Sequence, residues 1–266
     1  MCGIGGLSTA GPFTRRQAEM CIRLLASLTR RGTDAWGYFD GTTVYKEPGD
    51  FKESEKYETL ADELYAAGTD IFLCHTRRAT RGDPRVNKNN HPFRLDPFIL
   101  AHNGVLFATE DFENKWGIET DSFWMLYWIW EEYQRLGDVP EAIDEGVDHV
   151  MGVYACWLHD MDSRTTYLFR MENPIVETVA HVETGMAMFG SDVQSLLDGL
   201  GWRGLPWRKK PRFARLRPAM IYRMEAGEIR RVKFFTPGLL SPLQLARFTE
   251  LQGDLARYCT PGLPYL

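Results

Sequence analysis

The chain has no apolar run close to the ~18 residues that a membrane-spanning helix needs, because charges or glycines interrupt every apolar stretch. Its first residues also lack the basic segment and the long apolar segment of a secretory signal peptide. Both absences argue against a membrane-bound or secreted protein. The sequence therefore predicts a cytoplasmic protein that does not act at a membrane.

The cysteines show no regular spacing. Their number is five, which is odd, and no Cys-x-x-Cys pair occurs among them. Neither a disulfide framework nor a zinc site is predicted, because both need recurring cysteine spacings. No metal or organic cofactor is expected, and no phosphate-binding P-loop is present. The five positions are Cys2, Cys21, Cys74, Cys156 and Cys259.

The formal net charge is only −5, but the charges are unevenly distributed. Residues 203–233 contain eleven Arg and Lys against two Glu, whereas residues 110–148 contain twelve acidic residues against two basic ones. A basic stretch of this kind is a candidate for binding phosphate or nucleic acid. The alternative is a solvated face that offsets the acidic stretch. We favour that alternative because no aromatic-basic RNA-binding motif accompanies the stretch.

Hydrophobic periodicity divides the chain into helices and two groups of strands. Thr14 and Gln17 form a capping-box pattern before a helix that ends near Gly32. A helix at 121–135 is apolar on nearly all sides, which predicts that it is sandwiched between layers. The remaining predicted elements are a buried strand at the N-terminus, a helix at 54–67, buried strands at 71–77 and 98–102 around a loop at 80–97, strands at 152–159, 165–171, 176–182 and 186–190, a short helix at 192–200, a hairpin at 219–235 and a helical pattern at 241–258. This order indicates a layered α+β domain.

Cys2 is the residue with the clearest chemical meaning. If Met1 is removed, Cys2 carries both a thiol and a free α-amine. The α-amine, with an ordinary pKa of roughly 7.7–8.0, can accept the proton of the thiol near neutral pH. Nucleophile and base then belong to one residue, as in N-terminal-nucleophile enzymes. The alternative is a chance cysteine that packs as a small hydrophobic side chain.

Short motifs elsewhere favour the nucleophile. In chain order they are Cys2-Gly-Ile-Gly-Gly, Arg31-Gly-Thr-Asp-Ala-Trp-Gly37, His75-Thr-Arg-Arg-Ala-Thr-Arg-Gly82, Asn90-His-Pro-Phe93, His102-Asn-Gly104 and Glu119-Thr-Asp121. This series resembles the class II glutamine amidotransferase family, whose glutaminase domains include that of glucosamine-6-phosphate synthase. The resemblance covers residues 2–235 and implies a four-layer αββα sandwich. Residues 236–266 remain as a C-terminal extension with a possible partner-docking helix.

The resemblance implies roles for residues that would hold the two ends of glutamine. Arg77 matches the family's arginine for the α-carboxylate, which a guanidinium can bind with two parallel hydrogen bonds. Thr80 matches a threonine near the same carboxylate, and Asp121 matches the acid that pairs with the α-ammonium. A surface arginine is the alternative for Arg77. For Asp121 it is a helix N-cap, and the same aspartate can serve both purposes.

The resemblance also implies an oxyanion hole at Asn103 and Gly104. An asparagine amide and a glycine N–H can stabilise the negative charge that develops on the amide oxygen of the substrate. The alternative is an Asn-Gly turn that closes a hairpin. Gly32 matches a glycine that lines the pocket beside the nucleophile. His91 matches a position in the loop over the pocket, where we expect a lid or support residue.

Two positions depart from the family pattern. Arg78 and Arg81 stand where the family often has Trp and His. The Trp helps to couple glutamine hydrolysis to the acceptor domain, so its replacement leaves the coupling open while the glutamine chemistry stays plausible. Arg81, Arg85 and Lys88 make the loop basic, which suits a phosphorylated or nucleic-acid-like acceptor; exposed loop charges are the alternative.

These observations predict a glutaminase. Cys2 would attack L-glutamine, form a γ-glutamyl thioester and release ammonia for an acceptor enzyme on another chain. One alternative is a different N-terminal-nucleophile hydrolase that acts on γ-glutamyl amides or peptides. The other is a non-enzymatic module that binds nucleic acid through the basic stretch 203–233.

Overall fold

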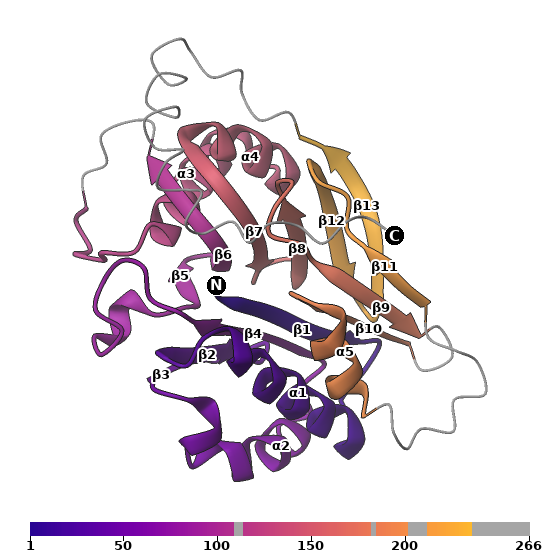
Figure 1. Cartoon of the computed structure of the whole chain (residues 1–266). Coiled ribbons are helices and arrows are strands. Elements are labelled where there is room, and N and C mark those ends of the chain that lie inside the picture. Colours follow the sequence, from indigo (N-terminus) through magenta and orange to yellow (C-terminus); the bar gives the residue numbers. More distant parts are fainter. Residues whose placement is uncertain (109–113, 182–184, 202–211, 236–266) are drawn as a thin grey trace.

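The protein forms two stacked antiparallel sheets with helices on their outer faces (Figure 1). The computed structural model describes residues 1–108, 114–181, 185–201 and 212–235. The predicted helix at 241–258, the proposed extension 236–266 and the part of the basic stretch at 203–211 lie outside the described residues.

The first sheet has seven strands in the order β11-β9-β10-β1-β4-β2-β3. Its strands are β1 Gly3–Thr9, β2 Ala35–Phe39, β3 Val44–Pro48, β4 Ile71–Arg77, β9 Glu177–His181, β10 Met186–Gly190 and β11 Arg212–Arg215. The N-terminal strand β1 lies in the middle, paired with β4 on one side and β10 on the other. The first residues of the chain are therefore held by a fully paired strand.

The second sheet has six strands in the order β13-β12-β8-β7-β6-β5. Its strands are β5 Phe93–Leu95, β6 Phe98–Ala108, β7 Val150–Asp160, β8 Thr165–Arg170, β12 Met220–Glu225 and β13 Glu228–Phe234. The longest ladder joins β6 to β7 from Phe98 to Ala108 without a break. This ladder carries the predicted oxyanion residues.

The helices divide between the two outer faces. The first sheet is covered by α1 Arg15–Leu28, α2 Lys56–Ala66 and α5 Val193–Leu200, and the second by α3 Ser122–Leu136 and α4 Val139–Gly146. The predicted capping box is present, because Thr14 accepts from the Gln17 N–H and Gln17 accepts from the Thr14 N–H. Gly137 ends α3 in the left-handed conformation at φ 69°, which costs a glycine little.

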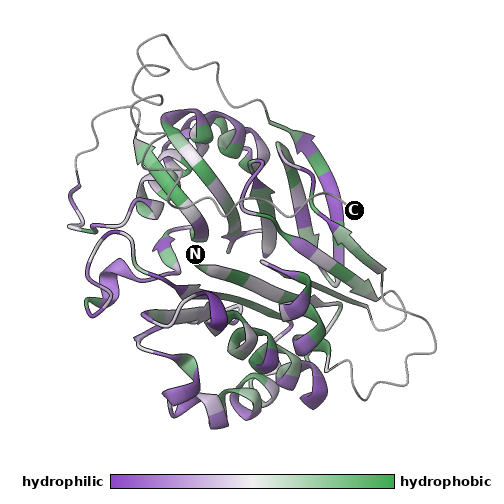
Figure 2. Ribbon diagram, in the orientation of Figure 1, coloured by the Kyte–Doolittle hydropathy of each residue, from purple (hydrophilic) through white to green (hydrophobic). Residues whose placement is uncertain are grey.

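Three hydrophobic clusters fill the three interfaces between the four layers. Strand β1 contributes to two of these clusters, because successive side chains of a strand point to opposite faces of the sheet. Ile4 joins the cluster between the two sheets, and Leu7 joins the cluster between the first sheet and α1. A third cluster lies between the second sheet and α3 and α4. Figure 2 shows apolar colour along the strands and polar colour on the outer sides of the helices. The predicted four-layer αββα sandwich is confirmed.

The structure differs from the sequence prediction in several elements. The strand expected at 98–102 continues to Ala108, and β2, β3, α4, β11 and strand β5 within the predicted loop 80–97 are not among the predicted elements. Helix α3 is an outer layer and is not enclosed between two layers. Its inner side buries Phe123 and Ile129, whereas Trp124 and Trp128 on its other sides are only partly buried. Aromatic side chains thus extend around α3 without a second layer of secondary structure over them in the described residues.

Candidate active site

Cys2 lies directly before the central strand β1. Gly3 pairs with Thr76, so Cys2 lies beside the end of β4. The backbone N–H of Arg78 donates to Cys2 Sγ at 3.3 Å, and Sγ also contacts the Arg78 carbonyl oxygen at 3.5 Å. The thiol is therefore held at the junction between β4 and the loop that follows it.

Opposing effects act on the pKa of the Cys2 thiol. Burial raises this pKa and outweighs the Arg78 N–H, the positive N-terminal amine and the Arg77 guanidinium, which each lower it. The thiol therefore carries its proton at neutral pH. A nucleophilic thiolate needs a base within reach, and the positive amine that lowers the thiol pKa in this structure belongs to Met1.

Gly32 lies directly against the backbone that holds the thiol. A Cβ atom at this position would lie 2.3 Å from the carbonyl carbon of Arg77 and 2.5 Å from the N atom of Arg78. Only glycine permits this close approach. Gly32 therefore lets the end of β4 come near enough for the Arg78 N–H to reach Cys2 Sγ.

Two neighbours of Gly32 fix the same backbone by hydrogen bonds. The Asp34 N–H donates to the Arg77 carbonyl at 3.0 Å, and Asp34 Oδ2 accepts from the Ala79 N–H at 2.7 Å. Arg31 Nε donates to the Cys2 carbonyl at 2.8 Å. The Arg31-Gly-Thr-Asp motif thus positions both Cys2 and the loop beside it.

The Arg77 side chain is buried, with 2% of its surface exposed. Its Nη1 donates to Asn90 Oδ1 at 2.6 Å, and its Nη2 donates to the carbonyls of Arg81 and Gly82. Nε and the second Nη1 hydrogen have no partner within the described ranges. Arg77 is thus fixed in place. Part of its guanidinium group is already hydrogen-bonded to the protein, and its remaining N–H donors can bind a ligand.

Asp121 is a buried carboxylate that caps α3. Its Oδ1 accepts from the Ser122 N–H at 3.0 Å and its Oδ2 from the Leu106 N–H at 2.7 Å. No ion pair to Asp121 is present in the described part of the chain. Burial lowers the pKa of Arg77, and the charges of Cys2 and Asp121 oppose that shift, so the three groups share one electrostatic environment. The N-cap alternative is confirmed, and the carboxylate's charge has no cationic partner among the residues that the structure describes.

Asn103 and Gly104 lie inside a strand and do not form a turn. They pair with Ala155 and Tyr154 of β7, so the turn alternative is wrong. Gly104 has φ 147°, and a Cβ there would lie 1.9 Å from the Val153 carbonyl oxygen. Asn103 is fully buried, and neither atom of its side-chain amide has a hydrogen-bond partner among the described residues. A buried amide without a partner is costly for stability alone and suits a group held ready for a ligand.

The other two predicted residues have different surroundings. Thr80 is exposed on the loop after β4. His91 is buried, forms a hydrogen bond between Nε2 and Ser122 Oγ at 2.7 Å, and stacks on His75 with ring centroids 3.9 Å apart. The structure therefore places His91 as an interior support, and not as an exposed lid.

Five further residues of the site region have no role predicted from the sequence: His75, His102, Ser122, Asn90 and Asp34. All five lie within or directly after the quoted motifs. His75 and His102 lie in apolar strands, where a histidine resembles an ordinary core residue. Their position one or two residues before Arg77 and Asn103 was the available signal.

The described cations of the basic stretch are largely paired with acids. Arg215 lies 2.7 Å from Glu177, and Lys233 lies 2.5 Å from Asp144. The other pairs are Arg223 with Glu225, Arg230 with Glu228 and Lys233 with Glu141. This pairing fits the solvated-face interpretation of residues 212–233.

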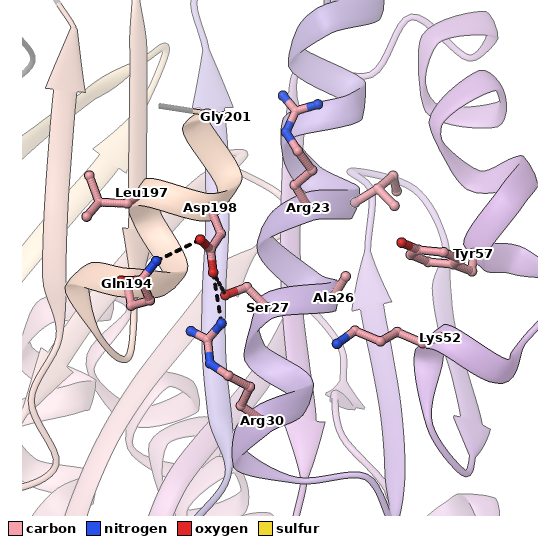
Figure 3. Close-up of a pocket in the computed structure, with 11 residues that line it drawn as sticks. Arg23, Ala26, Ser27, Arg30, Lys52, Tyr57, Gln194, Leu197, Asp198 and Gly201 are labelled. Atoms are coloured by element: carbon pink, nitrogen blue, oxygen red, sulfur yellow. Dashed lines mark hydrogen bonds and ion pairs between the residues drawn. The ribbon is translucent and has the colours of Figure 1, made fainter. Parts of the chain in front are cut away.

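A groove of about 550 Å³ lies between α1, α2 and α5 (Figure 3). Asp198 accepts there from Arg30 at 2.8 Å and from Ser27 at 2.7 Å, so these polar groups bind one another. No cysteine lines the groove. Cys2 is not a lining residue, although Arg31, which directly follows the lining residue Arg30, contacts the Cys2 carbonyl.

Residues 1–173 match the family described as "Glutamine amidotransferases class-II". The chain belongs to the class II glutamine amidotransferase family. This match confirms the resemblance and identifies the chain as a glutamine amidotransferase domain of an enzyme family.

Curated relatives agree with this family. The chain is 28% identical over 210 residues to a glutamine–fructose-6-phosphate aminotransferase (isomerizing) of Oceanobacillus iheyensis, covering 74% of this chain and 33% of the relative. It is 35% identical over 167 residues to the protein of the same name from Francisella tularensis, covering 58% of this chain and 26% of the relative. The chain thus spans a third or less of the length of these relatives.

Solved structures share the fold. Glutamine phosphoribosylpyrophosphate amidotransferase from B. subtilis matches with a TM-score of 0.61 at 16% identity, over 90% of this chain and 50% of that one. A glutamine aminotransferase class-II domain protein from Silicibacter pomeroyi matches with a TM-score of 0.57 at 14% identity, over 90% of this chain and 100% of that one. At these identities the likeness concerns the fold alone.

Proposed function

We propose that residues 2–235 form a glutaminase domain that hydrolyses L-glutamine to glutamate and ammonia through Cys2. The observation that supports this most directly is the Cys2 thiol at the start of β1, in the same electrostatic environment as Arg77 and Asp121. A guanidinium and a carboxylate are the charges that an α-amino acid needs at its two ionic groups. Removal of Met1 makes Cys2 the first residue.

The proposed reaction runs through a covalent intermediate. The α-amine of Cys2 takes the thiol proton, and the sulfur attacks the side-chain amide carbon of glutamine. Asn103 and Gly104 stabilise the oxyanion that forms. The amine returns the proton to the leaving nitrogen, ammonia departs, and a γ-glutamyl thioester remains on Cys2. Water then attacks the thioester and releases glutamate and the free thiol.

The substrate is oriented by charges at its α-carbon. Arg77 holds the α-carboxylate with its remaining donors, and Asp121 holds the α-ammonium. Thr80, Gly32 and His91 complete the surroundings, with Gly32 admitting the close backbone and His91 supporting the loop from inside. The ammonia passes to an acceptor site outside residues 2–235, and we propose residues 236–266 as a segment that contacts the acceptor enzyme.

The free N-terminus provides the decisive experiment. Protein whose mass shows that Met1 has been removed should release ammonia from glutamine, and Cys2→Ser should be nearly inactive because a hydroxyl ionises far less readily than a thiol. A tag fused before Cys2 should abolish activity, whereas the same tag fused after Leu266 should preserve it.

The comparison of substrates separates this proposal from a related hydrolase. Ammonia should be released from free glutamine faster than amines are released from γ-glutamyl conjugates. Full activity with Met1 retained, or a preference for the conjugates, would overturn the proposed function.

A further inference from the structure

Ser122 connects two buried histidines beside the proposed oxyanion hole. Its Oγ lies 2.7 Å from His91 Nε2 and 2.8 Å from His102 Nδ1. All three side chains are at most 3% exposed. A third histidine extends the group, because His75 Nε2 lies 3.1 Å from the His102 carbonyl oxygen.

The chemistry of these groups fixes how the protons are arranged. A carbonyl oxygen only accepts, so His75 carries its proton on Nε2. The Ser122 hydroxyl has one proton, so it donates to one imidazole and accepts from the other. Burial lowers the pKa of all three histidines, which keeps them neutral at pH 7 and preserves this pattern.

The Ser122 bridge and a second contact enclose the oxyanion residues. Ser122 follows Asp121 at the start of α3, and His102 precedes Asn103 on β6. One hydrogen bond between α3 and β6 therefore joins Ser122 to His102. The other joins Asp121 Oδ2 to the Leu106 N–H at 2.7 Å. Asn103 lies between these two hydrogen bonds on β6, so they fix its distance from Asp121.

The histidines also join this region to the first sheet. His91 stacks on His75 of β4, and a Cβ at Gly37 of β2 would lie 2.2 Å from the His91 carbonyl oxygen. The backbone at His91 thus lies directly against β2. Through Ser122 the start of α3 is anchored to both sheets.

We propose that Ser122, acting through His91 and His102, sets the separation between Asp121 and the oxyanion strand and thereby selects glutamine over asparagine. This inference rests on the proposed glutaminase function. With the α-ammonium at Asp121 and the amide oxygen at Asn103, the side chain between them must have one length. Asparagine is one methylene shorter, and a rigid site can discriminate such a difference by about 10–200-fold.

The test is Ser122→Ala, which deletes the bridging hydroxyl and leaves Asp121 and Asn103 unchanged. We expect kcat for glutamine to fall about tenfold with KM changed by less than about twofold, because misplaced reacting groups lower the rate more than ground-state binding. We also expect the ratio of kcat/KM for glutamine to that for asparagine to fall about tenfold. Ser122→Cys, which keeps the size but weakens the hydrogen bonds, should move both quantities in the same direction.

Thr166→Val is the matched control. Thr166 Oγ1 lies 2.9 Å from His159 Nδ1, so this change also deletes a buried hydroxyl that pairs with an imidazole, but on β8. It should lower the melting temperature and leave the substrate ratio unchanged. The inference would be overturned if a folded Ser122 variant kept the wild-type ratio of kcat/KM for glutamine to that for asparagine. It would also be overturned if Thr166→Val lowered this ratio as much as the Ser122 variants do. Wild-type protein without glutaminase activity would instead overturn the proposed function.

Discussion

Asn103 combines two properties that rarely occur together in a residue kept for stability. Its side chain is fully buried, and both atoms of its amide lack partners among the described residues. An unpaired buried amide costs roughly 1–3 kcal/mol of stability. At the residue scale, Asn103 therefore looks like a group that is maintained for a ligand at a cost to the fold.

This gives the Asn103→Ala variant an expected signature. We expect kcat for glutamine to fall by about 10²–10³-fold with little change in KM, because an oxyanion donor acts mainly in the transition state. The melting temperature should stay level or rise, because the Asn103 side chain has no hydrogen bond to lose among the described residues. Steady-state kinetics and a thermal melt of the same sample decide the matter. A lower melting temperature with kcat retained would identify Asn103 as a structural residue.

At the scale of elements, local patterns predicted those features that depend on neighbouring residues. The capping box of α1 and strand β4 follow from residues close in sequence, and both are present. The turn alternative for Asn103-Gly104 is wrong because it rests on the local preference of Asn-Gly for hairpin turns. Pairing with β7, about fifty residues away in the chain, overrides that preference. The contact of His75, His91 and His102 depends on tertiary packing, so no local signal could reveal it.

The packing of Gly32 against the end of β4 can be tested by substitution. In Gly32→Ala the new Cβ must displace the Arg77–Arg78 backbone, so the Arg78 N–H moves away from Cys2 Sγ. We expect glutaminase kcat to fall at least about tenfold, since displacements of ~1 Å can cost far more. Gly11→Ala is the control, because a Cβ there meets nothing within 4 Å. Equal activity of the two variants would contradict the role assigned to Gly32.

At the scale of the whole molecule, buried neutral histidines link stability to pH. Burial lowers the pKa of His159 from 6.5 to about 4, and it lowers the pKa of His75, His91 and His102 as well. The unfolded chain binds protons at these sites as the pH drops below about 6.5, whereas the folded chain does not. Acid therefore favours the unfolded chain.

The expected result is a loss of stability between pH 6.5 and 4. Each such histidine contributes up to roughly 1.4 kcal/mol per pH unit to the fall in the free energy of unfolding. Urea unfolding at several pH values should show this slope, and His159→Asn should reduce it by about one histidine's share. The reference is stability above pH 7, where all these histidines are neutral in both states. An identical slope in His159→Asn would contradict the prediction.

The central place of β1 also has a consequence for synthesis. This strand pairs with β4 through Gly3–Thr76 and with β10 through Gly5–Gly190, so one of its neighbours is made more than 180 residues later. Pairings so distant in sequence form late, because the intervening chain must first be made and closed into a loop. The first residues of the chain thus stay accessible while most of the domain is being translated, as the proposed removal of Met1 requires. The surroundings of the Cys2 thiol are then complete only in molecules that have completed the sheet, so under the proposed function an unfinished chain has no assembled active site.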